Sequence, residues 1–470
     1  MNRYLNLIRN IGLFAISNIA LKLISFFLIP LYTVQLSTAE YGVVDMLNTV
    51  ILMVLPLATL SVCDAVLRYC IEDKQNQTIY ATVGLGFTCL SCGIVAACLP
   101  ILDLHFFGGL GDYKGWFLLC YAAIAFQTLF SNISRGVGKV SVMATASVLS
   151  SVTNILAVLV TLIVFRYNVR GVFFSLALGN GVACLYYCFA GRLYRYFRVQ
   201  KGEFRHISKN MLIYSLPLIP NSLSWWMTQN INRFFITGIL GIGISGMYAA
   251  AAKIPSILSL ITSIFDQAWS LSAFQEYKHN SKVDFFKAIF TVYNAFLTIC
   301  VSVMIVFSPY IAHILLQNDF YEGWIYIPTL LIAFYYMALN SFWGSVYTSS
   351  LKTTYLFITT LVGAILCIVC TYFFINWWGA IGACIASAIS AMMTWILRVI
   401  HAQTIIPVFI NRISLSLTQI AMIVLAAVNT LLLPCRVLFN VIAVIIVCAL
   451  QLQQTVPYIS LLKKKLLQKK

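Results

Sequence analysis

Long apolar stretches constrain the fold of this chain more than any other feature. About fourteen of them can be marked along the 470 residues, and a helix needs about 20 apolar residues to cross a bilayer. Only 9% of the residues are charged, against ~25% in soluble proteins. We therefore predict an all-α polytopic membrane protein. The predicted spans are 11–36, 46–67, 80–102, 115–134, 142–165, 171–190, 212–237, 246–272, 286–310, 324–345, 355–375, 380–399, 414–433 and 437–459.

The predicted spans leave only about a dozen residues for each connection or tail. This excludes an ATP-binding cassette, a glycosyltransferase domain or another large catalytic unit on this chain. The GxGxxG pattern at 241–246 joins two predicted helices with no strand before it, so it does not predict a dinucleotide site. There is no GxxxxGK[ST] or HExxH motif. We expect a protein that is not an enzyme, with no catalytic residues, metal site or cofactor.

Lys and Arg residues are distributed unequally between the connections on the two sides of the membrane. With the N-terminus in the cytoplasm, 23 of the 30 lie inside and four outside, and three remain within spans. Cytoplasmic loops carry an excess of Lys and Arg, so we predict that both termini and the connection 191–210 are cytoplasmic. The net charge of +17 is spread between apolar segments rather than gathered on one face, which argues against nucleic-acid binding.

Segments of the first half recur in the second half at offsets of 203 to 213 residues. The repeat unit has six spans, an even number, so the two units should run in the same direction about a pseudo-two-fold axis along the membrane normal. Transporters with such repeats bind substrate between the units and rock one against the other. The matched residues are Asn18 with Asn221, Gly42 with Gly246, Lys139 with Lys352, and Gly171 with Gly382.

The repeat predicts the division of the chain into domains. An N-terminal six-helix lobe covers 1–190, a cytoplasmic linker 191–210 and a C-terminal six-helix lobe 211–400. An additional helix pair follows at 413–460, with a polybasic tail at 461–470. The tail either anchors the topology or binds anionic lipid headgroups.

Three cations within the predicted spans mark the candidate substrate site: Lys22, Arg233 and Lys253, on the first, seventh and eighth helices. An ionisable side chain in hydrocarbon costs at least ~2.5 kcal/mol, so such residues usually face a protein interior or a wet cavity. Arg and Lys are the usual ligands of phosphate. We therefore predict an anionic, phosphate-bearing substrate. For Lys22, snorkelling or a structural ion pair remains the alternative.

Amide side chains accompany these cations on the same helices. Asn18 lies one turn before Lys22, and Asn221 and Asn232 lie on the helix of Arg233. Residues three or four apart share a helix face. We include the three asparagines in the predicted substrate site, as hydrogen-bonding groups beside the cations.

Two carboxylates and one further cation are candidates for coupling or gating. Asp64 and Arg68 are four residues apart and can pair on one helix face, as a structural or a functional pair. Asp266 is about 220° around its predicted helix from Lys253, so it can face a different neighbour.

Six segments in the first and second halves of the chain carry a family resemblance. They are Asn18-x3-Lys22, Phe26-Phe27-Leu28-Ile29-Pro30-Leu31-Tyr32-Thr33, Leu36-Ser37-x2-Glu40-Tyr41-Gly42, Asn232-Arg233-Phe234, Leu240-Gly241 and Gly246-Met247-Tyr248-x4-Lys253-Ile254-Pro255. These segments resemble those of the polysaccharide transporter family of Wzx-type lipid-linked oligosaccharide flippases. This family belongs to the MATE-like multidrug/oligosaccharidyl-lipid/polysaccharide exporter (MOP) superfamily. Members often have an acidic residue before the helix-7 arginine, where this chain has Asn232.

The resemblance implies transfer of an undecaprenyl-diphosphate-linked oligosaccharide to the outer leaflet of a bacterial inner membrane, for O-antigen, capsule or exopolysaccharide. Membrane lipids, a glycan polymerase and assembly proteins are the implied partners. A MATE-type drug/cation antiporter is the alternative with the same architecture. A membrane polysaccharide polymerase is a further alternative. Such enzymes typically have a long outer loop, whereas the predicted outer connections of this chain are short.

Overall fold

The computed structural model describes residues 28–197, 204–277, 282–350, 352–408, 412–431 and 436–467. Within these ranges the chain is helical and contains no strand. Eleven helical segments are long and apolar enough to cross a membrane. These findings confirm the predicted all-α polytopic membrane protein.

The eleven segments fit a chain of about fourteen spans. The longest, Thr354–Ala402, contains two helices, because Gly379 interrupts it with φ 59° and ψ −143°. Helix α9 (Leu218–Leu240) is long enough to span, but its Asn, Gln and Arg side chains make it more polar than the eleven. Most of the first predicted span, 11–36, lies outside the described residues.

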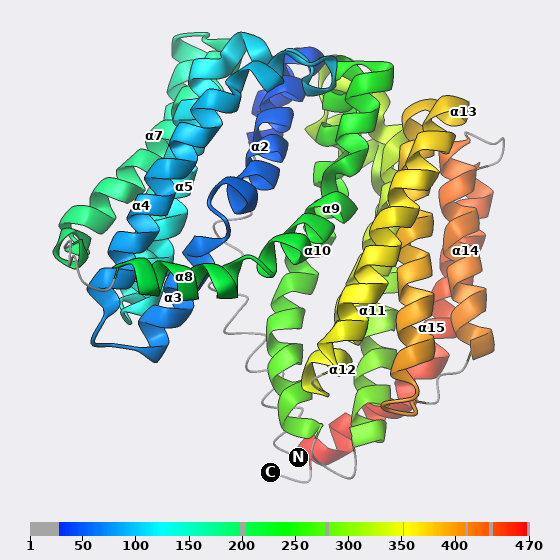
Figure 1. The fold of residues 1–470 in the computed structure, drawn as a ribbon. Coiled ribbons are helices and arrows are strands. Elements are labelled where there is room, and N and C mark those ends of the chain that lie inside the picture. The colour runs from blue at the N-terminus through cyan, green and yellow to red at the C-terminus, as the bar shows by residue number, and fades with distance from the viewer. Residues whose placement is uncertain are drawn as a thin grey trace. The chain divides into compact units, whose positions relative to one another are not determined.

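The contacts divide the chain into two compact units (Figure 1). The first unit is Val34–Gly246, and the second joins Met247–Lys470 with the segment that ends at Thr33. These borders differ from the lobe borders expected from the sequence, and the division into lobes, linker, helix pair and tail stays a prediction. Besides α9, the helices of the first unit are α2 (Thr38–Ala58), α3 (Val62–Glu72), α4 (Gln77–Cys98), α5 (Lys114–Gly136), α6 (Val140–Leu159), α7 (Asn168–Phe189) and α8 (Phe204–Ser215).

The second unit is built around a buried aromatic cluster. Trp269 is fully buried, and its ring stacks 4.5 Å from that of Phe342. The Trp269 indole also donates to the Phe342 carbonyl at 3.2 Å, which satisfies its polar atom inside the core. The helices of this unit are α10 (Ile242–Glu276, which begins in the first unit), α11 (Lys282–Leu315), α12 (Ile327–Ser349), α13 (Thr353–Ala402), α14 (Arg412–Thr430) and α15 (Arg436–Leu467).

Polar side chains hold the last two helices to each other and to the rest of the second unit. Asn429 of α14 and Asn440 of α15 exchange amide hydrogen bonds of 2.7 and 3.2 Å. The Tyr335 hydroxyl of α12 donates to Asn294 of α11 at 2.7 Å and accepts from Gln419 of α14 at 3.5 Å. Hydrogen bonds of this kind help membrane helices associate, because lipid supplies no hydrophobic drive between them.

Local breaks differ from the predicted spans. The span predicted at 46–67 is two helices, α2 and α3, because Leu60 and Ser61 adopt φ of 52° and 51°. Pro56 precedes this break by one turn, and a proline inside a helix removes a backbone hydrogen bond. Helix α2 starts at Thr38, directly after its N-cap Ser37 and eight residues before the predicted start. The prediction began later because the first turns of α2 carry polar residues such as Glu40 and Asp45.

Matching backbone geometry supports the internal repeat. Gly42 and Gly246 are each the fifth residue of their helices, α2 and α10. Lys139 and Lys352 precede α6 and α13 with nearly equal angles, φ −88° and ψ 52° against φ −96° and ψ 52°. Each also donates its backbone N–H to the residue five positions earlier. Equivalent turns therefore recur at the predicted offset.

Candidate functional site at the contact of α2 and α9

A buried ion pair joins α2 to α9 in the first unit. Arg233 Nε lies 2.7 Å from Asp45 Oδ2, and the two side chains are 17% and 10% exposed. The Nε–H is not aligned for a hydrogen bond, so the contact is mainly electrostatic. A membrane-embedded cation is costly unless it is paired or hydrated. Asp45 therefore explains how Arg233 is tolerated at this position.

Neutral groups complete the surroundings of the Arg233 guanidinium. Its Nη1 donates to the Thr49 hydroxyl at 3.3 Å and to the Asn230 side-chain oxygen. Asp45 and Thr49 are four residues apart on α2, so they present acceptors on one face. The Trp226 indole donates to the Thr49 carbonyl at 2.9 Å, one helix turn from Asn230. The guanidinium is thus held by α2 and by its own helix.

Two glycines let the start of α2 pack directly on the start of α10. A Cβ added at Gly246 would clash with the Thr38 carbonyl oxygen and would lie 2.7 Å from the Gly42 nitrogen. A Cβ added at Gly42 would meet the Ile242 carbonyl oxygen. Small residues allow membrane helices to approach closely. The two glycines matched by the repeat therefore form one backbone contact.

A capping box fixes the start of α2. The Ser37 side chain accepts from the Glu40 backbone N–H, and Glu40 accepts in return from the Ser37 N–H at 2.8 Å. Glu40 also accepts from the Asn168 amide at 2.7 Å, at the start of α7. These bonds satisfy backbone donors that a helix start leaves open. The Ser37-x2-Glu40 part of the motif thus orients α2, which carries Asp45.

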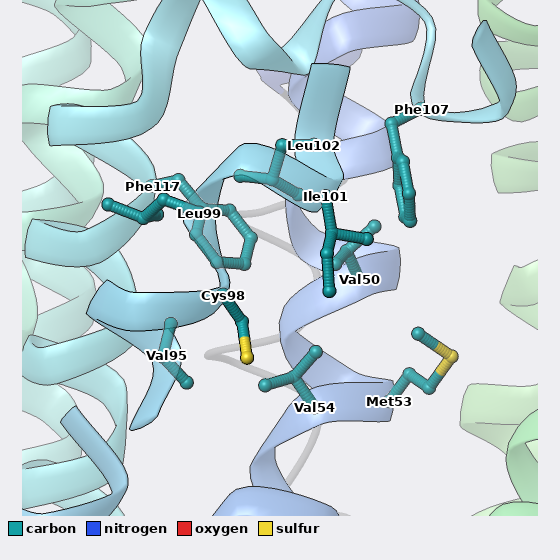
Figure 2. A pocket seen from close by; sticks show the side chains of 10 residues that line it. All are labelled: Val50, Met53, Val54, Val95, Cys98, Leu99, Ile101, Leu102, Phe107 and Phe117. Carbon is teal, nitrogen blue, oxygen red and sulfur yellow. The ribbon is translucent and has the colours of Figure 1, made fainter. Parts of the chain in front are cut away.

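An apolar pocket of about 180 Å³ lies in the same unit as the ion pair. Val50, next to Thr49 in sequence, lines it, as does Phe107, whose ring packs 5.7 Å from that of Phe234. Figure 2 shows side chains of α2, α4 and α5 pointing into the space together with those of the connection after α4. Such a lining suits a hydrocarbon group rather than a sugar or a phosphate.

The other predicted substrate residues are on α9, on α10 or outside the described residues. Asn232 is 5% exposed on α9, next to Arg233. Asn221 is exposed near the start of α9, twelve residues or roughly 18 Å along the helix. Lys253 lies on α10 in the second unit and is half-buried. Asn18 and Lys22 lie outside the described residues.

The coupling candidates occupy two different surroundings. Arg68 pairs with Glu72 at 2.8 Å instead of the expected Asp64, and its guanidinium lies 4.4 Å from the centre of the Tyr214 ring. The pairing of Arg68 with Asp64 that we expected was therefore wrong. Both neighbours of Arg68 at a distance of four residues are acidic, and Arg68 pairs with the later one, Glu72. Asp64 is exposed on α3, where Arg135 is the charge that acts on it.

Asp266 is a half-buried residue on α10 in the second unit, and one of its carboxylate oxygens is buried. Its Oδ1 has no hydrogen-bond partner among the described residues, and the Tyr293 hydroxyl of α11 has none either. Ser341 of α12 interacts with the same carboxyl group. A buried carboxylate that is only partly satisfied is a reasonable place for a proton or a cation to bind.

Sequence reasoning missed two residues. Asp45 directly precedes the predicted span 46–67, and it is not among the residues predicted from the sequence to accompany Arg233. Its position at the edge of an apolar stretch is the only signal for it in the sequence. Arg398, near the end of the predicted span 380–399, is one of the 23 Lys and Arg residues counted as cytoplasmic, yet it is 5% exposed. Its guanidinium donates to the Thr359 and Thr360 hydroxyls and to the Asn340 carbonyl, at 2.7 to 3.1 Å. Arg398 lies in α13 after the break at Gly379, and these bonds join it to α12 and to the part of α13 before the break.

These features define a multi-pass helical membrane protein with a charged helix contact inside its first unit. The family model described as "Polysaccharide biosynthesis protein" matches residues 7–270, more than half of the chain. The chain therefore belongs to this family. A comparison with curated protein sequences finds no match.

Solved structures show the same fold at low sequence identity. The lipid II flippase MurJ, in an inward closed conformation, matches with a TM-score of 0.69 and 14% identity, over 97% of this chain and 99% of MurJ. An inward-facing MATE family multidrug resistance transporter of the MOP superfamily matches with a TM-score of 0.69 and 15% identity, over 83% of this chain and 98% of that transporter. A MOP superfamily transporter from Pyrococcus furiosus matches with a TM-score of 0.57 and 16% identity, over 85% and 96%. The chain has the fold of MOP superfamily transporters.

Proposed function

We propose that this protein is a flippase for undecaprenyl-diphosphate-linked oligosaccharides in a bacterial inner membrane, working by alternating access. The observation that carries the proposal is the buried Arg233–Asp45 pair on a fold shared with a lipid II flippase, in a member of a polysaccharide biosynthesis family. A diphosphate can replace Asp45 as the partner of Arg233, since guanidinium binds phosphate and carboxylate oxygens alike. Arg233 then holds substrate in one state and Asp45 in another.

Substrate chemistry is consistent with the groups near Arg233. A lipid-linked oligosaccharide carries a diphosphate, sugars and a long hydrocarbon chain. We assign the diphosphate to Arg233, Lys253 and Lys22, and the sugars to Asn18, Asn221 and Asn232. The apolar pocket lined by Val50 and Phe107 suits part of the hydrocarbon. Membrane lipids, a glycan polymerase and assembly proteins remain the proposed partners.

The proposed coupling residues are Asp64, Arg68 and Asp266. Among them, Asp266 has the strongest support, because one of its carboxylate oxygens is buried with no partner in the described chain. Binding of a proton or a cation there removes an uncompensated charge from the membrane interior. Such binding is a means of linking transport to an ion gradient.

Reporter fusions test the proposed orientation. We expect cytoplasmic reporter activity for fusions after Lys470 and within 191–210, because 23 of the 30 Lys and Arg residues lie on that side. A fusion in the connection after α4, near Gly109, is the matched control and should report from the periplasm. Periplasmic activity at either of the first two positions would contradict the orientation.

Deletion of the gene tests the proposed activity. We expect lipid-linked repeat units to accumulate on the cytoplasmic leaflet, with no polymer outside, because each unit must cross before it is polymerised. Leaflet-specific labelling of the lipid-linked unit measures this directly. A lost polymerase would instead leave single units at the surface. Wild-type levels of the unit in the outer leaflet, in a strain without a second flippase, would refute the proposal.

A drug/cation antiporter is the second candidate, because the similarity to a MATE family transporter has the same TM-score as that to MurJ. The three cations of the proposed substrate site, Lys22, Arg233 and Lys253, disfavour a cationic substrate. Deletion of an antiporter should raise sensitivity to cationic dyes and leave the glycan unchanged. The same deletion strain therefore separates the two functions.

A further inference from the structure

Three cations gather at one end of the first unit, outside the site described above. Lys139 lies in the turn between α5 and α6, and Arg192 and Arg195 follow α7. The spans Leu110–Gly136, Val140–Val164 and Asn168–Phe189 end or begin at this level. The cluster of Lys139, Arg192 and Arg195 therefore lies just beyond the ends of membrane helices, where lipid headgroups are found.

Contacts with the protein hold Lys139 in place. Its Nζ donates to the Gly191 carbonyl at 2.8 Å, just past the end of α7, and lies 5.0 Å from the centre of the Tyr196 ring. A cation at a helix C-terminus is stabilised by the helix dipole. The Lys139 ammonium group is thus fixed close to the exposed side chains of Arg192 and Arg195.

No carboxylate in the described part of the chain neutralises this cluster. Within the described residues, none of its three cations forms an ion pair with an acidic side chain. Partial burial, followed by repulsion from Arg192 and Arg195, lowers the pKa of Lys139. The orientation of the chain in the membrane explains an excess of Lys and Arg on this side. It does not explain why these three cations lie close enough to repel one another. An anion bound among them would relieve that repulsion.

A neighbouring amphipathic helix indicates that this end of the unit lies at a membrane surface. In Figure 1, α8 runs across the lower end of α4 and lies next to α3. It buries Ile207 and Met211 in the core of the unit and exposes Arg205 and Lys209. A helix with one apolar and one basic face is typical of the boundary between headgroups and hydrocarbon.

We propose that the cluster of Lys139, Arg192 and Arg195 binds the headgroup phosphate of an anionic phospholipid in the adjacent leaflet. The fixed Lys139 supplies a preorganised ammonium donor, and the two arginines supply guanidinium donors that can turn toward the phosphate. The lipid acyl chains lie along the exposed apolar surface of α6 and α7, which includes Phe189. This inference does not depend on the transported substrate.

Native mass spectrometry of the purified full-length protein tests the site. The protein is equilibrated with micelles that contain phosphatidylglycerol or phosphatidylcholine at near-physiological salt. We expect wild-type protein to retain phosphatidylglycerol in preference to phosphatidylcholine. The Lys139→Gln/Arg192→Gln/Arg195→Gln variant should retain phosphatidylglycerol about tenfold less well, because each basic residue near an anionic surface contributes to lipid binding.

A matched variant separates a site from general charge. Lys74→Gln/Arg166→Gln/Arg170→Gln removes the same charge from exposed positions in the same unit, outside the cluster and outside α8, and should retain phosphatidylglycerol within about twofold of wild type. Equal loss in both triple variants would overturn the proposal, as would equal retention of the two lipids by wild type. Displacement of the lipid by millimolar inorganic phosphate would overturn it in favour of a free-anion site. The Arg192→Gln/Arg195→Gln variant keeps the Lys139 bond and should still bind less lipid, which guards against misfolding of the triple variant.

Discussion

Gly246→Ala should strongly reduce the amount of folded protein in the membrane. The new Cβ would collide with the Thr38 carbonyl oxygen and the Gly42 backbone, and backbone atoms cannot turn aside as a flexible side chain can. Overpacking of this kind costs about 1–3 kcal/mol and occasionally more. We expect the upper part of that range, seen as a lower thermal unfolding midpoint and a smaller monodisperse fraction after purification.

Gly243→Ala is the matched control for this prediction. It lies one turn earlier on α10, and its added Cβ would have only the Thr38 hydroxyl nearby, at 3.4 Å. Alanine is favoured over glycine in a helix by up to about 1 kcal/mol. This variant should therefore be as stable as wild type or slightly more stable. If the two variants unfold at the same temperature, the close approach of α2 and α10 is not present in the folded protein.

The membrane helices were predictable because the signal for each span is local. About 20 apolar residues in a row are enough to identify one. The four spanning segments that contain α4 to α7 begin and end within five residues of their predicted spans. The break at Leu60 and Ser61 was not predictable in the same way. Neither residue is a glycine, and their left-handed backbone conformation is set by how α2 and α3 pack rather than by their own preference.

The composition of the candidate site was predicted in part. A cation within a span is visible in sequence, so Arg233 could be selected for its cost in hydrocarbon. Its partner could not, because Asp45 lies 188 residues earlier and no local pattern links two helices across that distance. The identity of the pair is a property of the packing between α2 and α9. The same holds for Arg398, whose acceptors Thr359, Thr360 and Asn340 come from separate parts of the second unit.

Neutralising one member of the Arg233–Asp45 pair should destabilise the protein far more than neutralising both. Asp45→Asn leaves a buried guanidinium without its counter-ion, and Arg233→Gln leaves a buried carboxylate. Breaking a buried pair in this way costs about 3–5 kcal/mol, whereas removing both charges is often close to neutral. We expect both single variants to lower the thermal midpoint and the double variant Asp45→Asn/Arg233→Gln to recover most of it. The exposed Arg170 supplies the control, since Arg170→Gln removes one charge from the same unit without breaking a buried pair.

Transport by the same variants separates a structural pair from a substrate ligand. If Arg233 binds the diphosphate, Arg233→Gln and the double variant should both lose glycan export in a deletion strain, even though the double variant is stable. Asp45→Asn should keep part of its export, because the cation that binds phosphate is still present. Complementation by each variant is compared at equal amounts of membrane-inserted protein, with Arg170→Gln expected to export at the wild-type level. Full export by the double variant would show that the pair only holds α2 to α9, and the diphosphate would then have to be held by cations other than Arg233.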